Sequence, residues 1–362
     1  MLLYNIGPKP IPDYGAATTQ RQKQRAAGLH PDYWYPALWS NELEPGQVKE
    51  VVFWKRSIAV FRGADGRVRA LENRCAHRQL KLSLGNVEGC ELTCAYHGWT
   101  YDESGKCTHI EHSLFGHKMP NVKVQAFPVE ERYGIIFIFP GNPERQAAHP
   151  LPEIPEWDKR SGWGKIPADF LWRAHHSIII DNTCDFTHAY LHREKRPFTF
   201  AELKTLNERP DAIDLEYDTR VGDTRLQRLV VNQKRTNTSA MKLGYQYPYQ
   251  WSSTDEKIKH WCFVLPIDER TTRAFFLFYF SPDTVQIPGI PLRLPAPIMN
   301  AFMPLAKRIF VTPLLAQDRV AVEAEQEGYE KHWDRPVPDL NPVPLAFMAL
   351  TIKKWEEYLA GQ

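Results

Sequence analysis

One short stretch limits what this chain can fold into more than any other. The segment CAHRQLKLSLGNVEGCELTCAYHGW (75–99) contains two pairs, Cys75 with His77 and Cys94 with His97. Sets of thiolates and imidazoles bind zinc or iron–sulfur clusters. Because the two pairs are well separated in sequence, we expect two neighbouring loops that together hold one metal centre.

The mixed composition of each pair distinguishes between these centres. A Cys₂His₂ zinc finger uses one Cys–Cys pair and one His–His pair. In a Rieske centre, two cysteines hold one iron of a [2Fe–2S] cluster and two histidines hold the other. We therefore predict a Rieske cluster bound by Cys75, His77, Cys94 and His97. A structural zinc site, assisted by other cysteines, is the alternative.

The residues around these ligands agree with a Rieske centre. Gly98 lets backbone N–H groups approach the cluster, and Trp99 can shield it from water. Rieske proteins of respiratory complexes resemble CTHLGC…CPCHG, with a disulfide between the two additional cysteines. Leu80 and Tyr96 stand at those positions, so this motif is more similar to the oxygenase and ferredoxin branch.

A second motif lies further along, in IIIDNTCDFTHAYLH (178–192). On a helix, His188 and His192 are four residues apart and share one face, with Asp185 one turn earlier. Two histidines and one carboxylate leave open positions on Fe(II) for dioxygen. Such a histidine pair also occurs by chance on amphipathic helices. A Rieske cluster upstream favours a metal site, because its electrons need an acceptor.

With both motifs, nearly the whole chain resembles the α subunits of Rieske non-haem iron oxygenases. The segments CAHR…CAYHGW and DNTCDFTHAYLH are similar to their cluster and mononuclear-iron motifs. The resemblance implies an α+β chain: a β-rich Rieske domain followed by a helix-grip (START-like) catalytic domain with an antiparallel sheet. It also implies a [2Fe–2S] cluster, a mononuclear Fe(II) and a head-to-tail homotrimer.

The resemblance assigns roles to individual residues. His188 and His192 become iron ligands, and an Asp at the start of a late helix becomes the third. In LLAQDRVAVEAEQEGYEK (314–331) that residue is Asp318, with Glu323 and Glu325 as alternatives.

Two further positions follow from the same resemblance. Asp185 becomes the bridge that passes electrons from His97 of a neighbouring subunit to His188, and Asn182 belongs to the surroundings of the iron. One departure is the spacing H-x₃-H, where many members have H-x₄-H. It is shared with carbazole dioxygenase-like enzymes and leaves the subgroup open. Ahead of the motif, His175 and His176 are expected on a strand, on opposite faces and in structural roles.

The chain divides into an N-terminal extension (1–28), a Rieske domain (29–145) and a catalytic domain (146–362). We expect the extension to be helical around 18–28 and to cover the outside of the fold. Hairpin turns are expected at 63–66 and at Ser104-Gly105. In the catalytic part, strands are expected at 224–233, 257–266 and 272–280, and helices at 314–331 and 344–359. The last helix is expected to bury the stripe Leu345, Met348, Ile352, Trp355 and Leu359.

Composition excludes several functions. Lys and Arg total 45 against 43 for Asp and Glu, and no basic block is present, which argues against nucleic acid. The N-terminus has no secretory signal pattern, and six cysteines do not form a disulfide scaffold, so we expect a cytoplasmic protein. The apolar stretch 287–316 contains three basic residues and six prolines, too broken for a membrane-spanning helix. Packing on the protein's own core is expected there, rather than contact with a membrane surface.

The expected activity follows from these parts. No G-x-G-x-x-G follows a strand, so electrons must come from a partner ferredoxin and/or flavin reductase, with NAD(P)H as the ultimate donor. Apolar segments such as AFFLFYF favour a hydrophobic substrate, aromatic or polycyclic, that reacts with O₂. Resemblance of the C-terminal part to single-component-type monooxygenases favours hydroxylation or oxidative demethylation. Ring cis-dihydroxylation or angular dioxygenation is the alternative, and a Rieske electron carrier with a non-catalytic binding domain is a distant one.

Overall fold

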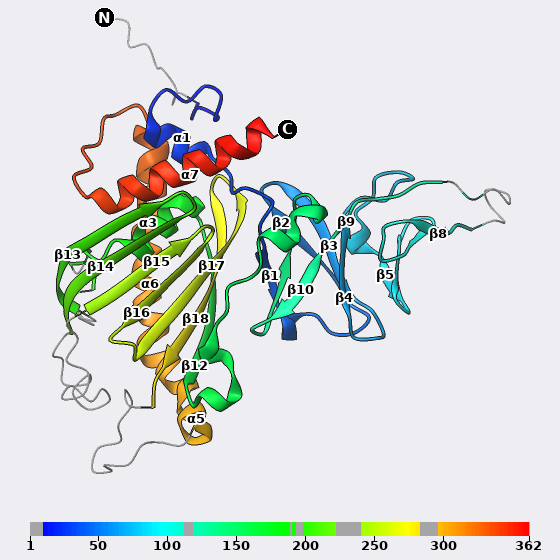
Figure 1. Cartoon of the computed structure of the whole chain (residues 1–362). Helices are drawn as coiled ribbons and strands as arrows, with labels where there is room; N and C mark the ends of the chain where they lie inside the picture. Colours follow the sequence, from blue (N-terminus) through cyan, green and yellow to red (C-terminus); the bar gives the residue numbers. More distant parts are fainter. Residues whose placement is uncertain are drawn as a thin grey trace, which may run out of the picture. The chain divides into compact units, whose positions relative to one another are not determined.

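The computed structural model describes residues 10–111, 119, 121–188, 190–192, 198–221, 240–282 and 296–361 (Figure 1). Its internal contacts divide the chain into two units. The first unit combines Met1–Leu29, Pro152–Val264 and Glu269–Gln362, and the second combines His30–Leu151 with Leu265–Asp268. The strand expected at 224–233 lies outside the described residues.

The second unit consists of three small antiparallel sheets, with strand orders β1-β11-β10, β2-β3-β4-β9 and β5-β6-β7-β8. The strands are β1 (Tyr35–Trp39), β2 (Val48–Phe53), β3 (Arg56–Arg62), β4 (Val68–Glu72), β5 (Asn86–Glu88), β6 (Glu91–Thr93), β7 (Thr100–Tyr101), β8 (Cys107–His109), β9 (Ala126–Phe127), β10 (Val129–Arg132) and β11 (Ile135–Ile138). The continuous apolar run of β11 is buried at the centre of its sheet, which explains why it shows no alternation.

Turn chemistry sets the hairpins of this unit. The two predicted turns are confirmed: Gly66 (φ 79°) lies between β3 and β4, and Gly105 (φ 80°) between β7 and β8. The β2–β3 turn is different, because its two residues, Trp54 and Lys55, adopt positive φ without being glycine. Their N–H groups donate to Pro266 O (2.7 Å) and Ile267 O (2.8 Å), so a distant segment of the chain holds this turn.

The first unit is built on a seven-stranded antiparallel sheet in the order β12-β18-β17-β16-β15-β14-β13. Its strands are β12 (Gly164–Trp172), β13 (Phe198–Arg209), β14 (Ala212–Val221), β15 (Ala240–Gln246), β16 (Tyr249–Thr254), β17 (Ile258–Asp268) and β18 (Thr271–Phe280). Strands β17 and β18 confirm the strands predicted at 257–266 and 272–280. Together with the helices below, the sheet confirms the α+β prediction.

The helices of this unit are α1 (Gln20–Ala26), α3 (His176–Cys184), α5 (Ala296–Ala306), α6 (Thr312–His332) and α7 (Pro342–Ala360). Helices α6 and α7 confirm the two predicted late helices. The predicted stripe of α7 is wrong in part, since Leu345 and Leu359 are 39 % and 42 % exposed. Because α7 packs against α1, α3 and β14, its buried face runs instead through Val343, Phe347 and Leu350.

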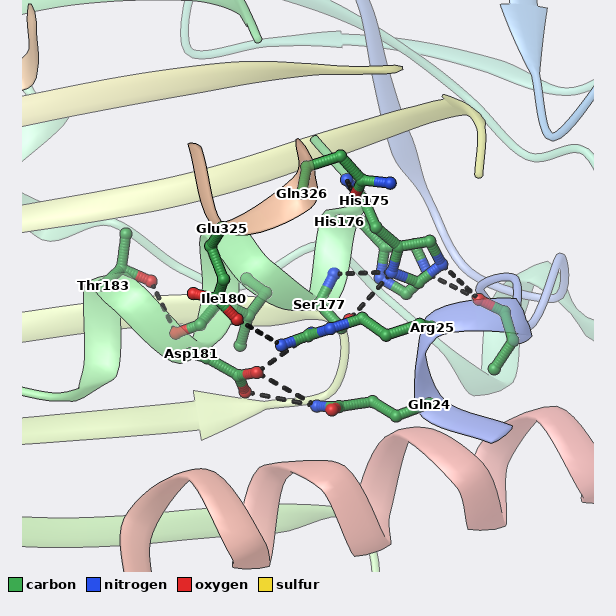
Figure 2. A network of polar contacts seen from close by, with 11 residues as sticks. Gln24, Arg25, His175, His176, Ser177, Ile180, Asp181, Thr183, Glu325 and Gln326 are labelled. Carbon is green, nitrogen blue, oxygen red and sulfur yellow. Dashed lines mark hydrogen bonds and ion pairs between the residues drawn. The ribbon is translucent and has the colours of Figure 1, made fainter. Parts of the chain in front are cut away.

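The expected outer position of the first helix is also wrong. Thr19 caps α1 through a capping box with Gln22, and three of its polar residues, Gln22, Gln24 and Arg25, are buried. Figure 2 shows why. The Arg25 guanidinium donates to Ser177 and Asp181 of α3 and to Glu325 of α6, the last two at 3.1 Å and 2.9 Å. Arg25 therefore connects three helices through one side chain.

His175 and His176 belong to the same network and not to a strand. His175 is the N-cap of α3. The rings of His175 and His176 lie next to each other, with centroids 4.1 Å apart, and not on opposite faces of the backbone. The Ala27 carbonyl accepts from Nε2 of both, at 3.1 Å and 2.8 Å. A carbonyl can only accept, so both Nε2 atoms carry hydrogen. Burial lowers the pKa of His175 and that of His176, the latter to about 4.

Within the apolar stretch 287–316, the described residues from Pro297 onward belong to one helical run that ends at His332, although a broken segment was expected. Pro304 lies inside α5, and a π-helix at Lys307–Val311 connects α5 to α6. A proline removes one N–H donor, and a wider helical turn lets the hydrogen-bond ladder resume. The expected packing on the protein's own core holds for only part of this run: Met299 and Met303 are buried, but only 22 % of its most apolar window is.

Candidate metal centres

Two loops of similar shape hold the four predicted cluster ligands. The first lies between β4 and β5 and the second between β6 and β7. In each, the backbone closes on its cysteine: Gln79 N–H donates to Cys75 O (2.9 Å), and Gly98 N–H donates to Cys94 O (3.1 Å). Gln79 (φ 62°) and Gly98 (φ 65°) occupy the same position in the two loops. The space that a Cβ of Gly98 would occupy is open, so glycine is favoured here by the positive φ and not by a close contact.

The two cysteines lie in the hydrophobic core of the unit, and the two histidines are half-buried. Cys75 and Cys94 are buried, and N–H groups of Tyr96 and His97 donate to the Cys94 sulfur. Burial raises the pKa of Cys94, and the neighbouring Cys75 thiol adds to the shift. The His77 and His97 rings lie 4.7 Å apart. Two thiols and two imidazoles brought together in this way match the donor set of a Rieske cluster.

Trp99 has the place that the sequence predicts for it, beside the ligands. Its ring stacks on His77 with centroids 4.6 Å apart and planes 6° from parallel, and it is 9 % exposed. Burial lowers the pKa of His77, and the nearby His97 lowers it further. A flat ring over one imidazole limits the access of water to that side of the site.

Tyr101 contacts a predicted cluster ligand, and sequence reasoning missed it. Its hydroxyl oxygen lies 3.2 Å from Cys75 Sγ and accepts the N–H of Ala76 at 3.0 Å. Since the amide already donates to the oxygen, the hydroxyl hydrogen is free to donate to the sulfur. Burial raises the pKa of Tyr101, and hydrogen bonding with Cys75 adds to this, so the group stays a neutral donor.

We expect Tyr101→Phe to lower the reduction potential of the cluster. A hydrogen bond to a ligand sulfur stabilises the more negative reduced state. If that bond is stronger by about 1 kcal/mol in the reduced state, the shift is about 40 mV for one electron. Spectroelectrochemical titration of the two proteins measures it. Tyr96→Phe, at an exposed tyrosine of the second loop, is the control, and an equal shift in both would remove Tyr101 from this role.

The histidines of the second motif are close together, but not on a helix. Helix α3 ends at Cys184, and Phe186, Thr187 and residues 190–192 lie in turns. The helix prediction is wrong because the Asp185 carboxylate accepts the N–H (2.8 Å) and hydroxyl (2.6 Å) of Thr187, which replaces helical hydrogen bonding. A further turn follows, in which the Leu191 N–H donates to His188 O at 2.9 Å and the chain reverses its direction. The His188 and His192 rings therefore meet, with centroids 5.2 Å apart.

Asp318 of α6 lies beside both rings. Its Oδ1 is 3.3 Å from His192 Nε2 and 3.8 Å from His188 Nε2, and one ligand atom from each residue lies within 4.8 Å of the others. Asp318 Oδ1 is buried and makes no hydrogen bond of ordinary geometry among the described residues. A bound cation would satisfy this oxygen. Two imidazoles and a carboxylate are the ligand set of non-haem Fe(II) sites, so the residues fit that ion.

The two histidines differ in their surroundings. Burial lowers the pKa of His188, although the charge of Asp318 opposes the shift. Burial also acts to lower the pKa of His192, but its contacts with Asp318 and with Gln317 outweigh burial and raise the pKa. Of the two histidines, His192 therefore has the stronger polar interactions with α6.

Gln317 was not predicted, although it precedes Asp318 directly. Its Oε1 lies 3.0 Å from His192 Nδ1 and, as an acceptor, requires hydrogen on that nitrogen. Nε2 then carries the lone pair that faces Asp318. Metal-bound histidines are usually oriented by such an acceptor on the other ring nitrogen. One residue pair of α6 thus provides both a carboxylate and the acceptor that fixes a neighbouring ring.

We expect Gln317→Leu to weaken metal binding at this group by about 10- to 100-fold, the usual cost of removing such a partner. Ferrous titration of protein that already carries its Rieske cluster measures the affinity. Gln317→Glu keeps an acceptor for Nδ1 and is the matched variant, so it should bind at least as tightly as the original. Equal affinities of the leucine variant and the original would show that Gln317 does not orient His192.

The other predicted residues lie apart from this group. Glu323 accepts the Arg173 N–H and pairs with Arg319, both at 3.0 Å, while Glu325 pairs with Arg25. Asn182 lies half-buried in α3. Asp185 follows that helix directly; its Oδ1 is held by Thr187, and its Oδ2 has no hydrogen-bond partner among the described residues.

Comparison with known proteins places both halves of the chain. The family model for the Rieske [2Fe-2S] domain matches residues 33–120, and that for the vanillate O-demethylase oxygenase C-terminal domain matches residues 172–347. A 4β-methylsterol monooxygenase of Methylococcus capsulatus is 40 % identical over 341 residues, which cover 94 % of this chain and 92 % of that relative. The oxygenase component of dicamba O-demethylase from Stenotrophomonas maltophilia is 31 % identical over 204 residues, 54 % of either chain.

Solved structures agree on the fold. Dicamba monooxygenase bound to dicamba matches with a TM-score of 0.72 at 21 % identity, covering 93 % of this chain and 100 % of that one. The Rieske match, the C-terminal match and the full-length relative lead to one conclusion. This chain belongs to the Rieske oxygenases, a family of oxidoreductases, and carries the [2Fe–2S] and catalytic domains of their α subunits in one polypeptide.

Proposed function

We propose that the chain is the terminal oxygenase of a monooxygenase system that oxidises a methyl group on a polycyclic, hydrophobic molecule of the methylsterol kind. Similarity to the methylsterol monooxygenase over 94 % of the chain carries this proposal. The group of His188, His192 and Asp318, of which the last two are buried, supports the same chemistry. The relatives also include oxygenase components named as O-demethylases of dicamba and of vanillate, and this favours monooxygenation over dioxygenation.

In this proposal Cys75, His77, Cys94 and His97 hold the cluster, and His188, His192 and Asp318 hold a mononuclear iron. When bound, the iron supplies dioxygen activation and the cluster supplies single electrons. Asp318 neutralises part of the charge of the ion, and Gln317 keeps the hydrogen of His192 on Nδ1. His192 and Asp318 are buried, whereas the side chain of His188 is 24 % exposed. His188 therefore marks the side from which a substrate can approach.

Asp185 is the proposed electron bridge in a head-to-tail homotrimer. Thr187 holds one carboxylate oxygen, and the other, which makes no hydrogen bond within the described part of the chain, would accept from an imidazole of a second copy, that of His97. The backbone of Asp185 also hydrogen-bonds the His188 imidazole, so bridge and ligand are adjacent. A ferredoxin or flavin reductase supplies the electrons. Six cysteines without a disulfide support a cytoplasmic location.

The test combines metal analysis with isotope labelling. Anaerobically purified protein should contain two irons and two sulfides for the cluster plus one further iron. Chemically reduced protein mixed with a 4β-methylsterol under ¹⁸O₂ should give a hydroxymethyl product with one labelled oxygen. Two labelled oxygens in the product would indicate dioxygenation. A protein that holds only the cluster iron after ferrous reconstitution would be an electron carrier, and the proposal would be wrong.

A further inference from the structure

Helix α5 is attached to the rest of its unit by one narrow face. Met299 and Met303 are buried and lie on β12 at Gly164, where a Cβ would come within 3.0 Å of Met303 Sδ and 3.2 Å of Met299 Cε. Asn300 points to the same strand and accepts the N–H of Lys165 at 3.1 Å. The absence of a side chain at Gly164 lets α5 approach β12 closely. These contacts determine which face of α5 points away from β12.

The face that looks away is apolar. Ile298, Phe302, Leu305 and Ile309 are 46 %, 48 %, 55 % and 37 % exposed. Ile298, Phe302 and Leu305, spaced four and three residues apart, lie along one side of α5, and Ile309 follows in the adjoining π-helix. We call these four residues the α5 stripe. Large apolar side chains are normally exposed singly; a continuous row of them indicates a surface that binds something.

The charged residues that flank the α5 stripe along the chain have one sign. Helix α5 contains no charged residue, and between Asp283 and Asp318 the charged residues are all basic: Arg293, Lys307 and Arg308. Arg293 lies outside the described residues. Lys307 donates to Pro167 O at 2.6 Å, while Arg308 is exposed and has neither a hydrogen bond nor an ion pair among the described residues. An apolar row that ends in basic side chains is complementary to a lipid surface with anionic headgroups.

We propose that the α5 stripe docks onto an anionic lipid bilayer, with Phe302 and Leu305 below the headgroups and Arg308 at the level of the phosphates. A second copy of the chain fits less well. Four side chains that are each about half exposed offer far less area than the roughly 800 Å² that each partner of a stable interface buries.

The helix lies on the membrane and does not cross it. The run from Pro297 to His332 is long enough to span, with a mean hydropathy of 1.2 in its best window. Its second part, however, carries Asp318 beside the two histidines and Glu325 on Arg25, inside the folded unit. A position at the membrane interface is compatible with both parts of the run, because α5 contacts lipid while α6 stays packed in the protein. Delivery of a membrane-dissolved substrate to α6 would follow, and that step alone rests on the proposed function.

Vesicle binding tests the docking surface without substrate or electron donor, so a failure of the proposed activity leaves it standing. The full chain with its cluster is mixed with sucrose-loaded vesicles of phosphatidylcholine, with or without phosphatidylglycerol, and the sedimented fraction is measured. We expect binding to the anionic vesicles that weakens as salt rises. The double change Phe302→Ser with Leu305→Ser should weaken it roughly 10- to 100-fold, and Arg308→Gln about 5-fold, on anionic vesicles only.

The matched control is Leu340→Ser, because Leu340 is 91 % exposed but lies between α6 and α7. It should bind as the original chain does. All four positions are exposed, so the variants should fold; an unchanged cluster spectrum checks this. Equal vesicle binding by the double variant and the original would overturn the proposal. So would an absence of vesicle binding combined with a change of oligomeric state in the double variant, which would make the α5 stripe a contact between copies.

Discussion

Asp318→Asn is expected to abolish oxygenation while the Rieske absorption remains unchanged. The substitution keeps the shape of the side chain but removes the negative charge that lies 3.3 Å from His192 Nε2. Loss of an outer partner of a metal ligand costs up to about 100-fold in affinity, so loss of a ligand charge should exceed that. Iron analysis should show one iron fewer per chain at constant sulfide, and turnover should fall below detection.

Glu323→Gln provides the comparison for this experiment. Glu323 lies on the same helix and was an alternative third ligand, but its carboxylate accepts from Arg173 and Arg319. Its variant should keep all of its iron and most of its activity. If Glu323→Gln loses iron and Asp318→Asn keeps it, the assignment of the third ligand is wrong.

Arg25→Ala is expected to destabilise the first unit by about 3–5 kcal/mol, the usual cost of breaking a buried ion pair from one side. Its side chain is only 5 % exposed, and Asp181, 14 % exposed, would lose its cation (Figure 2). For a unit of this size that corresponds to a fall in Tm of roughly 10 °C. Calorimetry of the cluster-loaded protein should show the transition of this unit shifted.

Lys23→Ala is the control, because it removes an exposed ion pair from the same helix in place of a buried one. Lys23 pairs with Glu356 at 3.0 Å, but the two side chains are 32 % and 50 % exposed. Removal of an exposed pair costs about 0–1 kcal/mol, so this variant should melt almost as the original does. Equal losses in both variants would mean that helix α1 is held by its overall packing and not by the Arg25 network.

The cluster loops were predictable because their information is local. The ligands of each loop lie two or three residues apart, and the backbone hydrogen bonds that shape the loops join residues four or five apart, as from Gln79 to Cys75. The grouping of His188, His192 and Asp318 was predictable, but the local backbone structure of the two histidines was not. Spacing brought His188 and His192 together as expected, yet a carboxylate turn at Asp185 replaced the predicted helix, because side-chain and helical hydrogen bonds compete for the same N–H groups.

The residues that sequence reasoning missed act across long separations. Gln317 hydrogen-bonds His192, which is 125 positions away in the sequence, and Arg25 hydrogen-bonds Asp181, which is 156 positions away. No periodicity links such positions, since each contact exists only after the sheet and helices have packed. Tyr101 is nearer to Cys75, at 26 positions, but it lies in a two-residue strand that has no recognisable pattern.

The β2–β3 turn has a practical consequence for dividing the protein. The Rieske unit is not one continuous piece of chain, because it includes Leu265–Asp268 from the far end of β17. Two carbonyls of that segment receive the N–H groups of Trp54 and Lys55. A fragment cut after Leu151 would expose both donors and leave a strained turn without its anchor. Spectroscopy of an isolated cluster domain therefore needs this short strand end supplied, for instance through a linker fused behind Leu151.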